Sequence, residues 1–213
     1  MLIPKVLSGL EMVVPVNIIS ETANMCAYNH HITQETALIN SFLAYNIYKF
    51  DRYRDSQEVG NSRDKTAEFL IFSSTIFIVT FLIHFKELDT LLIYMSTFMY
   101  KNIKRLPVPV KPFYVSSLWA ITTNVNDINL LLPYWANIFS LTNLGDITDY
   151  EEDISENVTT IPTKFGKKFA FNLCVVSSAI ALITFTQLPY FENNILNDFF
   201  IFSNVVPYMN ITL

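Results

Sequence analysis

"FLIFSSTIFIVTFLIHF", residues Phe69–Phe85, contains no Asp, Glu, Lys or Arg. Two further runs share this character: Ile128–Gly145, "INLLLPYWANIFSLTNLG", and Phe169–Tyr190, "FAFNLCVVSSAIALITFTQLPY". A β-strand is about 4–8 residues long, whereas a helix of about 17–25 residues crosses the apolar core of a bilayer. The length of these runs, and the lack of the alternation that a membrane β-barrel needs, predict membrane-spanning helices.

The composition agrees with a membrane protein. Of the 213 residues, 51% are hydrophobic and 15% are charged, whereas soluble domains carry about 25% charged residues. The net charge of −5 gives no sign of a nucleic-acid partner. Shorter apolar runs lie at residues 8–28, 34–50, 88–100, 112–126 and 198–213. We therefore predict an all-α, multi-pass transmembrane bundle of seven to eight helices, folded as one membrane-embedded domain over residues 1–213.

The basic residues support this helix count. If the apolar runs cross the bilayer in turn, residues 49–68, 101–111 and 146–168 are loops on the same side. Positive charge marks the cytoplasmic side of membrane proteins, and this side would carry all but two of the fourteen basic residues. They are Lys49, Arg52, Arg54, Arg63, Lys65, Lys101, Lys104, Arg105, Lys111, Lys164, Lys167 and Lys168.

Two of these loops carry acidic clusters. The first contains Asp51 and Asp55, and the third contains Asp146, Asp149 and Asp153. Residues three or four apart share one face of a helix, so each cluster can direct its carboxylates the same way. Like charges at this spacing repel each other. Because Mg²⁺ prefers oxygen ligands and binds one or two carboxylates together with phosphate oxygens, we predict that these five aspartates bind Mg²⁺.

The basic loop between the two acidic loops could bind the phosphate groups that accompany such a metal. "KNIKRLPVPVKP", residues 101–112, offers Lys104, Arg105 and Lys111. Arg binds phosphate with two parallel hydrogen bonds, and Lys acts as a point charge. We predict a diphosphate site at the membrane surface above an apolar interior.

A non-catalytic reading stays open. Charged residues commonly gather at the ends of membrane helices, so the acids can simply be solvated. A transporter would normally keep ionisable groups near mid-bilayer, but the apolar runs here are nearly free of them. A multi-pass membrane protein without enzymatic activity is therefore the alternative.

The third loop resembles a known motif. "GDITDYEEDISENVTTIPTKFG", residues 145–166, is similar to the second conserved motif of the UbiA superfamily of intramembrane prenyltransferases. That motif is a D-x-x-D-x-x-x-D run followed by a Thr-Leu-Pro-like turn and a Gly. The acids match Asp146, Asp149 and Asp153, and the tail matches Thr160, Ile161, Pro162 and Gly166.

The resemblance extends over roughly residues 35–190. The first family motif, N-x-x-x-D-x-x-x-D, is matched by Asp51 and Asp55, and Asn46 lies one residue before the position of its Asn. "NSRDK", residues 61–65, resembles the Arg-containing segment that follows. The basic loop resembles the family's loop between its fourth and fifth helices. The resemblance thus implies that Asn46 and Arg63 also bind the diphosphate.

The resemblance implies a nine-helix bundle with Mg²⁺ as cofactor. The acidic loops would bind the metal and a prenyl diphosphate donor, and Asp51, Asp55, Asp149 and Asp153 would be catalytic. The isoprenoid chain would be transferred within the membrane to an acceptor that is often aromatic. This chain has room for only one full helix and a short second one after Gly166, so we expect a short member that lacks the last one or two helices.

Overall fold

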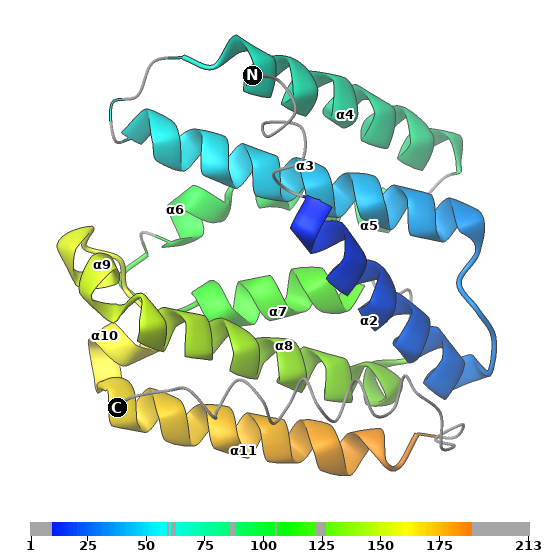
Figure 1. Ribbon diagram of the computed structural model, residues 1–213. Helices are drawn as coiled ribbons and strands as arrows, with labels where there is room; N and C mark the ends of the chain where they lie inside the picture. The colour runs from blue at the N-terminus through cyan, green and yellow to red at the C-terminus, as the bar shows by residue number, and fades with distance from the viewer. Residues whose placement is uncertain are drawn as a thin grey trace. The chain divides into compact units, whose positions relative to one another are not determined.

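In this computed structural model, the described residues are 10–58, 60, 63–85, 88–104, 106–121 and 127–188. Every regular element in these ranges is an α-helix (Figure 1), which confirms the all-α fold. The chain divides into two compact units, residues 1–18 with 32–97, called unit 1, and residues 19–31 with 98–213, called unit 2. The single domain over residues 1–213 stays a prediction.

Unit 1 is built around three helices. They are α3 (Gln34–Glu58), α4 (Lys65–His84) and α5 (Leu88–Thr97), and unit 1 also contains the first half of α2 (Leu10–Tyr28). Helix α4 begins where the Asp64 carboxylate accepts hydrogen bonds from the backbone N–H groups of Thr66 and Ala67, the usual way to satisfy the first free donors of a helix. Helix α4 packs against both α3 and α5.

Helix α8 (Ile128–Thr148) is the centre of unit 2. It packs against α7 (Lys111–Ile121), α10 (Ile161–Phe165) and α11 (Lys167–Phe185). Two further short helices are α6 (Tyr100–Lys104) and α9 (Tyr150–Ser155). Helices α8 and α11 run antiparallel, and α9 and α10 connect them at one end (Figure 1).

Small side chains line the contact between α8 and α11. The buried residues include Ala136 and Ser140 on α8 and Ala170, Ser178 and Ala181 on α11. The Ser178 hydroxyl donates to Ser140 Oγ at 3.0 Å, and Ser140 donates to the Cys174 carbonyl at 3.2 Å. Small residues let two backbones approach closely, which is how helices commonly associate inside membranes.

The outer faces of α4 and α11 are apolar. Exposed positions on α4 include Phe69, Phe72 and Ile76, and those on α11 include Val176 and Ile183. Helices on the surface of a soluble protein normally show the opposite pattern, with the polar face outward. Both helices, with mean hydropathies of 2.0 and 1.8, are long and apolar enough to cross a membrane. They are weak evidence of membrane association, because the core helix of a soluble protein can pass the same test.

Fewer of the described helices are long and apolar enough to span a membrane than the seven to eight that the sequence predicts. Only α4 and α11 meet the criteria for a span among the described residues. The run at 88–100 contains the short helix α5 and the first residue of α6. Of the run at 112–126, residues 112–121 lie in α7 and residues 122–126 lie outside the described residues. The run at 198–213 lies outside the described residues. The multi-pass arrangement stays a prediction.

Candidate functional site

The acidic run of unit 2 lies where α8 ends. Asp146 is in the last turn of α8, Asp149 follows the final helical residue, and Asp153 is in α9. The Asp146 and Asp153 residues are only 1% and 4% exposed, whereas Asp149 is exposed. Helical spacing predicts a shared face for all three, but the helix breaks at Asp149. Two of the three predicted metal ligands are therefore buried and the third faces outward.

Lys111 is the partner of Asp146. The Lys111 ammonium donates a hydrogen bond of 2.5 Å to Asp146 Oδ1. Both side chains are largely buried, with 13% and 2% of their surface exposed. Lys111 is the first residue of α7 and directly follows a segment with prolines at 107 and 109. A residue predicted to bind diphosphate is therefore paired with a residue predicted to bind the metal.

The electrostatics of this pair follow from burial and from its neighbours. Burial raises the pKa of Asp146 to about 6, with Lys111 opposing the rise and Asp153 and Asp149 adding to it. Burial lowers the pKa of Lys111, but Tyr100, Asp146 and Asp153 favour its charged form and raise the pKa on balance. Lys111 therefore stays a cation, while Asp146 titrates closer to neutral pH than an ordinary aspartate.

Between residues 143 and 153, three buried side-chain oxygens of α8 and α9 receive no hydrogen bond from the described residues: Asp146 Oδ2, Asp153 Oδ2 and Asn143 Oδ1. Asn143 lies three residues before Asp146 on α8 and is fully buried. Its Nδ2 donates a hydrogen bond of 2.8 Å to the Phe139 carbonyl. This bond identifies the nitrogen of the side-chain amide, so the atom without a partner is the oxygen. Buried acceptors without a donor are costly. A bound cation or a hydrogen-bond donor would satisfy them.

These donors fit Mg²⁺ by their chemistry, because Mg²⁺ takes carboxylate and amide oxygens. Among the side chains that the structure describes, no three His, Cys, Asp or Glu residues come together as a metal-binding group. Since Mg²⁺ usually takes only one or two protein carboxylates, the fit rests on Asp146 and its orphaned oxygen. Asn143 is not among the predicted ligands, and its only signal in the sequence is the three-residue spacing to Asp146.

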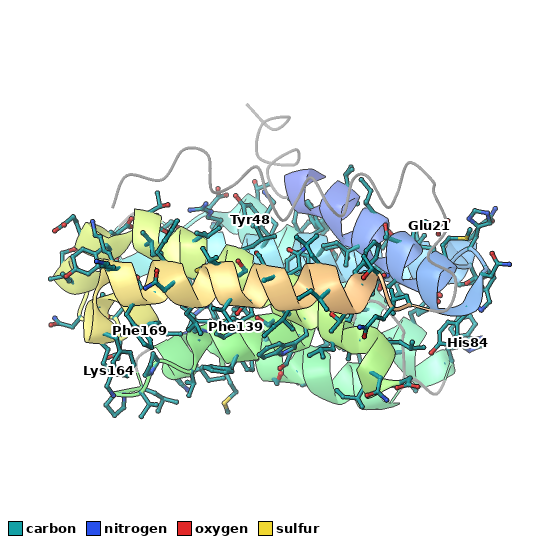
Figure 2. All side chains as sticks on the ribbon, turned by 90° about the horizontal axis from the view of Figure 1, so that it is seen from below. Glu21, Tyr48, His84, Phe139, Lys164 and Phe169 are labelled. Atoms are coloured by element: carbon teal, nitrogen blue, oxygen red, sulfur yellow. The ribbon has the colours of Figure 1, made fainter. Side chains whose placement is uncertain are left out.

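The tail of the acidic run forms a defined connection. Thr160 and Thr163 form a capping box at the start of α10, and Pro162 lies in the first turn of this helix. Gly166 joins α10 to α11 with a φ of 90°, a conformation that favours glycine. The Lys164 ammonium donates to the Pro107 carbonyl at 3.2 Å. The basic and acidic segments of unit 2 are therefore joined by two contacts, Lys111–Asp146 and Lys164–Pro107. Figure 2 shows Lys164 and Phe169 at one end of this unit.

The predicted ligands of unit 1 are placed differently. Helix α3 continues to Glu58, so Asp51 and Asp55 lie on a helix rather than in a loop. Asp51 is half-buried, and the side chain of Asp55 lies outside the described residues. No breaker separates the apolar and polar halves of α3, and Arg52 Nε donates to Tyr48 OH one turn earlier. The helix therefore continues through the acidic pair.

Asn46 is committed to packing between helices. Its Nδ2 donates to the Ile71 carbonyl at 3.0 Å, to Ser74 Oγ at 2.7 Å and to Thr75 Oγ1 at 3.1 Å. Its Oδ1 accepts a hydrogen bond of 2.8 Å from the Tyr94 hydroxyl. The residue is 1% exposed. These contacts give Asn46 a structural role in unit 1.

Apart from Lys111 and Asn46, the predicted diphosphate ligands are Arg63, Lys104 and Arg105, and of these three the structure describes only the side chain of Arg63. Arg63 is exposed and forms an ion pair with Glu68, which also accepts a hydrogen bond from the Tyr53 hydroxyl. Arg105 and the side chain of Lys104 lie outside the described residues. Of the predicted site, the described structure brings together Lys111, Asp146 and, by its electrostatic effect on both, Asp153.

Comparison with protein-family models, with curated proteins and with solved structures finds no match for this chain. The similarity to the UbiA superfamily therefore rests on the motif residues alone.

Proposed function

We propose that this protein is a Mg²⁺-dependent intramembrane prenyltransferase. It would move an isoprenoid chain from a prenyl diphosphate to a lipophilic, aromatic acceptor. The observation that carries the proposal is the buried Lys111–Asp146 ion pair, which has an orphaned carboxylate oxygen and lies within electrostatic reach of Asp153. A cation-binding group and an anion-binding group thus meet at one point of unit 2.

The proposed setting is a multi-pass integral membrane protein with its acidic and basic segments on the cytoplasmic-type side. The apolar outer faces of α4 and α11 support this setting. A prenyl chain is apolar and its diphosphate is strongly charged. A site beside a membrane helix, with charge at its end, suits both parts of such a molecule.

The residues divide the work by charge. In unit 2, Asp146 with Asp149 and Asp153 would hold Mg²⁺, which when bound supplies Lewis-acid stabilisation of the departing diphosphate. Asp51 and Asp55 of unit 1 are proposed as Mg²⁺ ligands on the sequence pattern. Lys111, with Lys104 and Arg105, would stabilise the negative charge that develops as the bond between the allylic carbon and oxygen breaks. The allylic cation then alkylates the acceptor, which loses a proton. An apolar interior protects the cation from water.

The alternative is a multi-pass membrane protein without activity, such as a transporter or an inactive relative of the UbiA superfamily. In that case the Lys111–Asp146 pair only stabilises the junction of α7 and α8. The two readings differ in whether Mg²⁺ and a prenyl diphosphate act on the protein together.

The test is transfer of a radiolabelled prenyl diphosphate to acceptors in a membrane lipid extract, with Mg²⁺ or with a chelator. We expect transfer by the unaltered protein and its loss in both Asp51→Ala and Asp149→Ala. Glu151→Ala is the matched control, because Glu151 is an exposed acid of α9 close to Asp149. Full activity in both aspartate variants would refute the mechanism.

A further inference from the structure

Lys111 can serve only one partner at a time. Its ammonium is 2.5 Å from Asp146 Oδ1, yet the proposed function, on which this inference rests, needs the same ammonium on the diphosphate. The proposed function also needs Asp146 on the metal. The ion pair thus keeps Lys111 from binding the diphosphate and Asp146 from binding the metal.

We infer that the Lys111–Asp146 pair is an internal competitor: either ligand must open it to bind, and because the first ligand bears the cost of opening, the binding of Mg²⁺ and diphosphate becomes cooperative. The two oxygens of the Asp146 carboxylate differ, and the difference indicates where a metal ion would first bind. Lys111 occupies Oδ1, while Oδ2 is buried and without a hydrogen bond from the described residues. A divalent cation on Oδ2 would face the Lys111 ammonium across one carboxyl group.

Two cations on one buried carboxylate repel each other strongly, because the surroundings screen charge poorly. Lys111 then needs another anion. A buried charge that loses its partner is costly, so Lys111 would not leave Asp146 for an apolar environment. A diphosphate removes this cost by accepting the ammonium.

The same reasoning applies in the other order. Diphosphate alone draws Lys111 away and leaves Asp146 buried and uncompensated beside the charge of Asp153. Either ligand alone therefore bears the cost of opening the pair, and the second ligand binds without it. Coupling between two ligands is reciprocal and typically changes affinity by about 5–150-fold.

The experiment measures binding rather than turnover. The full chain in detergent is titrated with Mg²⁺ alone, with inorganic pyrophosphate alone and with each in the presence of the other, by calorimetry and by thermal unfolding. In the unaltered protein, we expect each ligand to tighten the binding of the other by about tenfold or more.

Two variants remove one member of the pair each. Lys111→Gln should bind Mg²⁺ alone about tenfold more tightly, since the internal competitor is gone. Asp146→Asn should bind pyrophosphate alone about tenfold more tightly, since Lys111 is released. Both variants keep hydrogen-bonding side chains of similar size. The double variant, which has no buried charge left at this pair, gives a second measurement if a single variant fails to fold. Its coupling between the two ligands should be weaker than in the unaltered protein, because only the direct attraction between Mg²⁺ and pyrophosphate remains.

Lys167→Gln and Glu151→Gln are the matched controls. This pair also joins a lysine to an acid of unit 2, but at 3.8 Å and with Glu151 85% exposed. Its variants should bind both ligands as the unaltered protein does. If the unaltered protein binds both ligands but Lys111→Gln and Asp146→Asn leave the single-ligand affinities unchanged, the competitor role is wrong and the proposed function survives. If it binds neither ligand alone or together, both are wrong.

Discussion

Lys111 and Asp146, 35 residues apart in sequence, form a buried ion pair of 2.5 Å that joins the start of α7 to the last turn of α8. This pair unites the basic and acidic segments of unit 2. It also gives Asp146 an environment unlike that of a solvated surface acid. The physical consequences of this environment can be measured without any ligand.

The stability of the protein should depend on pH through Asp146. Its pKa in the folded state is about 6, above the ordinary value of 3.8. Between these values the folded protein binds more protons than the unfolded chain, so this carboxyl lowers stability as pH rises from about 4 to about 6. Lys111 stays charged throughout this range, and Asp149 and Asp153 are present in both proteins compared below.

The measurement compares the unaltered protein with Asp146→Asn by chemical unfolding in a chelator from pH 4 to pH 8. The stability of the unaltered protein should fall relative to the variant, with a slope approaching about 1.4 kcal/mol per pH unit between pH 4 and pH 6. Above pH 6 the difference should level off. A difference that is constant across this range would show that Asp146 has an ordinary pKa.

Asn46→Leu should destabilise unit 1 without affecting ligand binding. Leucine is close in size but loses the contacts to Ile71, Ser74, Thr75 and Tyr94. The two hydroxyls on α4 keep backbone acceptors one turn away, so the cost should be about 1–3 kcal/mol. Thermal unfolding measures it.

The control for this substitution is Asn17→Leu, because the Asn17 amide also joins two helices, by a 2.9 Å bond to Ser41, but is only partly buried. A smaller loss is expected there. If Asn46→Leu instead keeps full stability and loses the response to Mg²⁺ with pyrophosphate, Asn46 is a ligand as the motif resemblance implies.

Gly166→Ala should destabilise the junction of α10 and α11. No atom lies within 4 Å of the position that a Cβ would take, so the effect comes from the φ of 90° alone. Alanine at such a φ costs about 1–3 kcal/mol. Gly145 is the matched control, since it is equally open but lies inside α8. Gly145→Ala should raise stability by up to about 1 kcal/mol, and equal effects at both glycines would contradict the backbone argument.

A lysine on the outer face of α4 should impair membrane insertion according to its depth. Ile76 lies near the middle of the helix and Phe85 at its end, with similar exposures of 51% and 49%. Ile76→Lys should cost about 2.5–3.5 kcal/mol in an insertion assay. Phe85→Lys should cost much less because its charge can reach the interface. Equal and small effects would mean that this face is in water.

The long apolar helices could be predicted from the sequence, because uncharged runs of this length leave few alternatives. Phe69–Phe85 and Phe169–Tyr190 correspond to α4 and α11 with ends shifted by a few residues. Shorter runs were less informative. The run at 88–100, for example, is divided between α5, which ends at Thr97, and α6, which begins at Tyr100.

The candidate site could be predicted only in part. The residue types were visible in the sequence, but local spacing cannot show that Lys111 pairs with Asp146, since that contact depends on how α7 packs against α8. Spacing also predicted one shared face for Asp146, Asp149 and Asp153, but α8 ends just before Asp149, which is exposed, while Asp146 and Asp153 are buried. Asn46 had a hidden signal, the "SST" at residues 73–75 of an otherwise apolar run, whose hydroxyls need polar partners when buried.

The most direct test of the central claim is equilibrium binding of a radiolabelled prenyl diphosphate to the detergent-purified full chain, with Mg²⁺ and with a chelator. We predict saturable binding in the presence of Mg²⁺ and no binding in the presence of the chelator. Asp146→Asn and Asp149→Ala should each weaken the binding by at least about tenfold, which is the lower end of the effects seen when residues that support a metal site are replaced. Binding that is the same with Mg²⁺ and with chelator, or that both variants leave unchanged, would contradict the proposed prenyl diphosphate site.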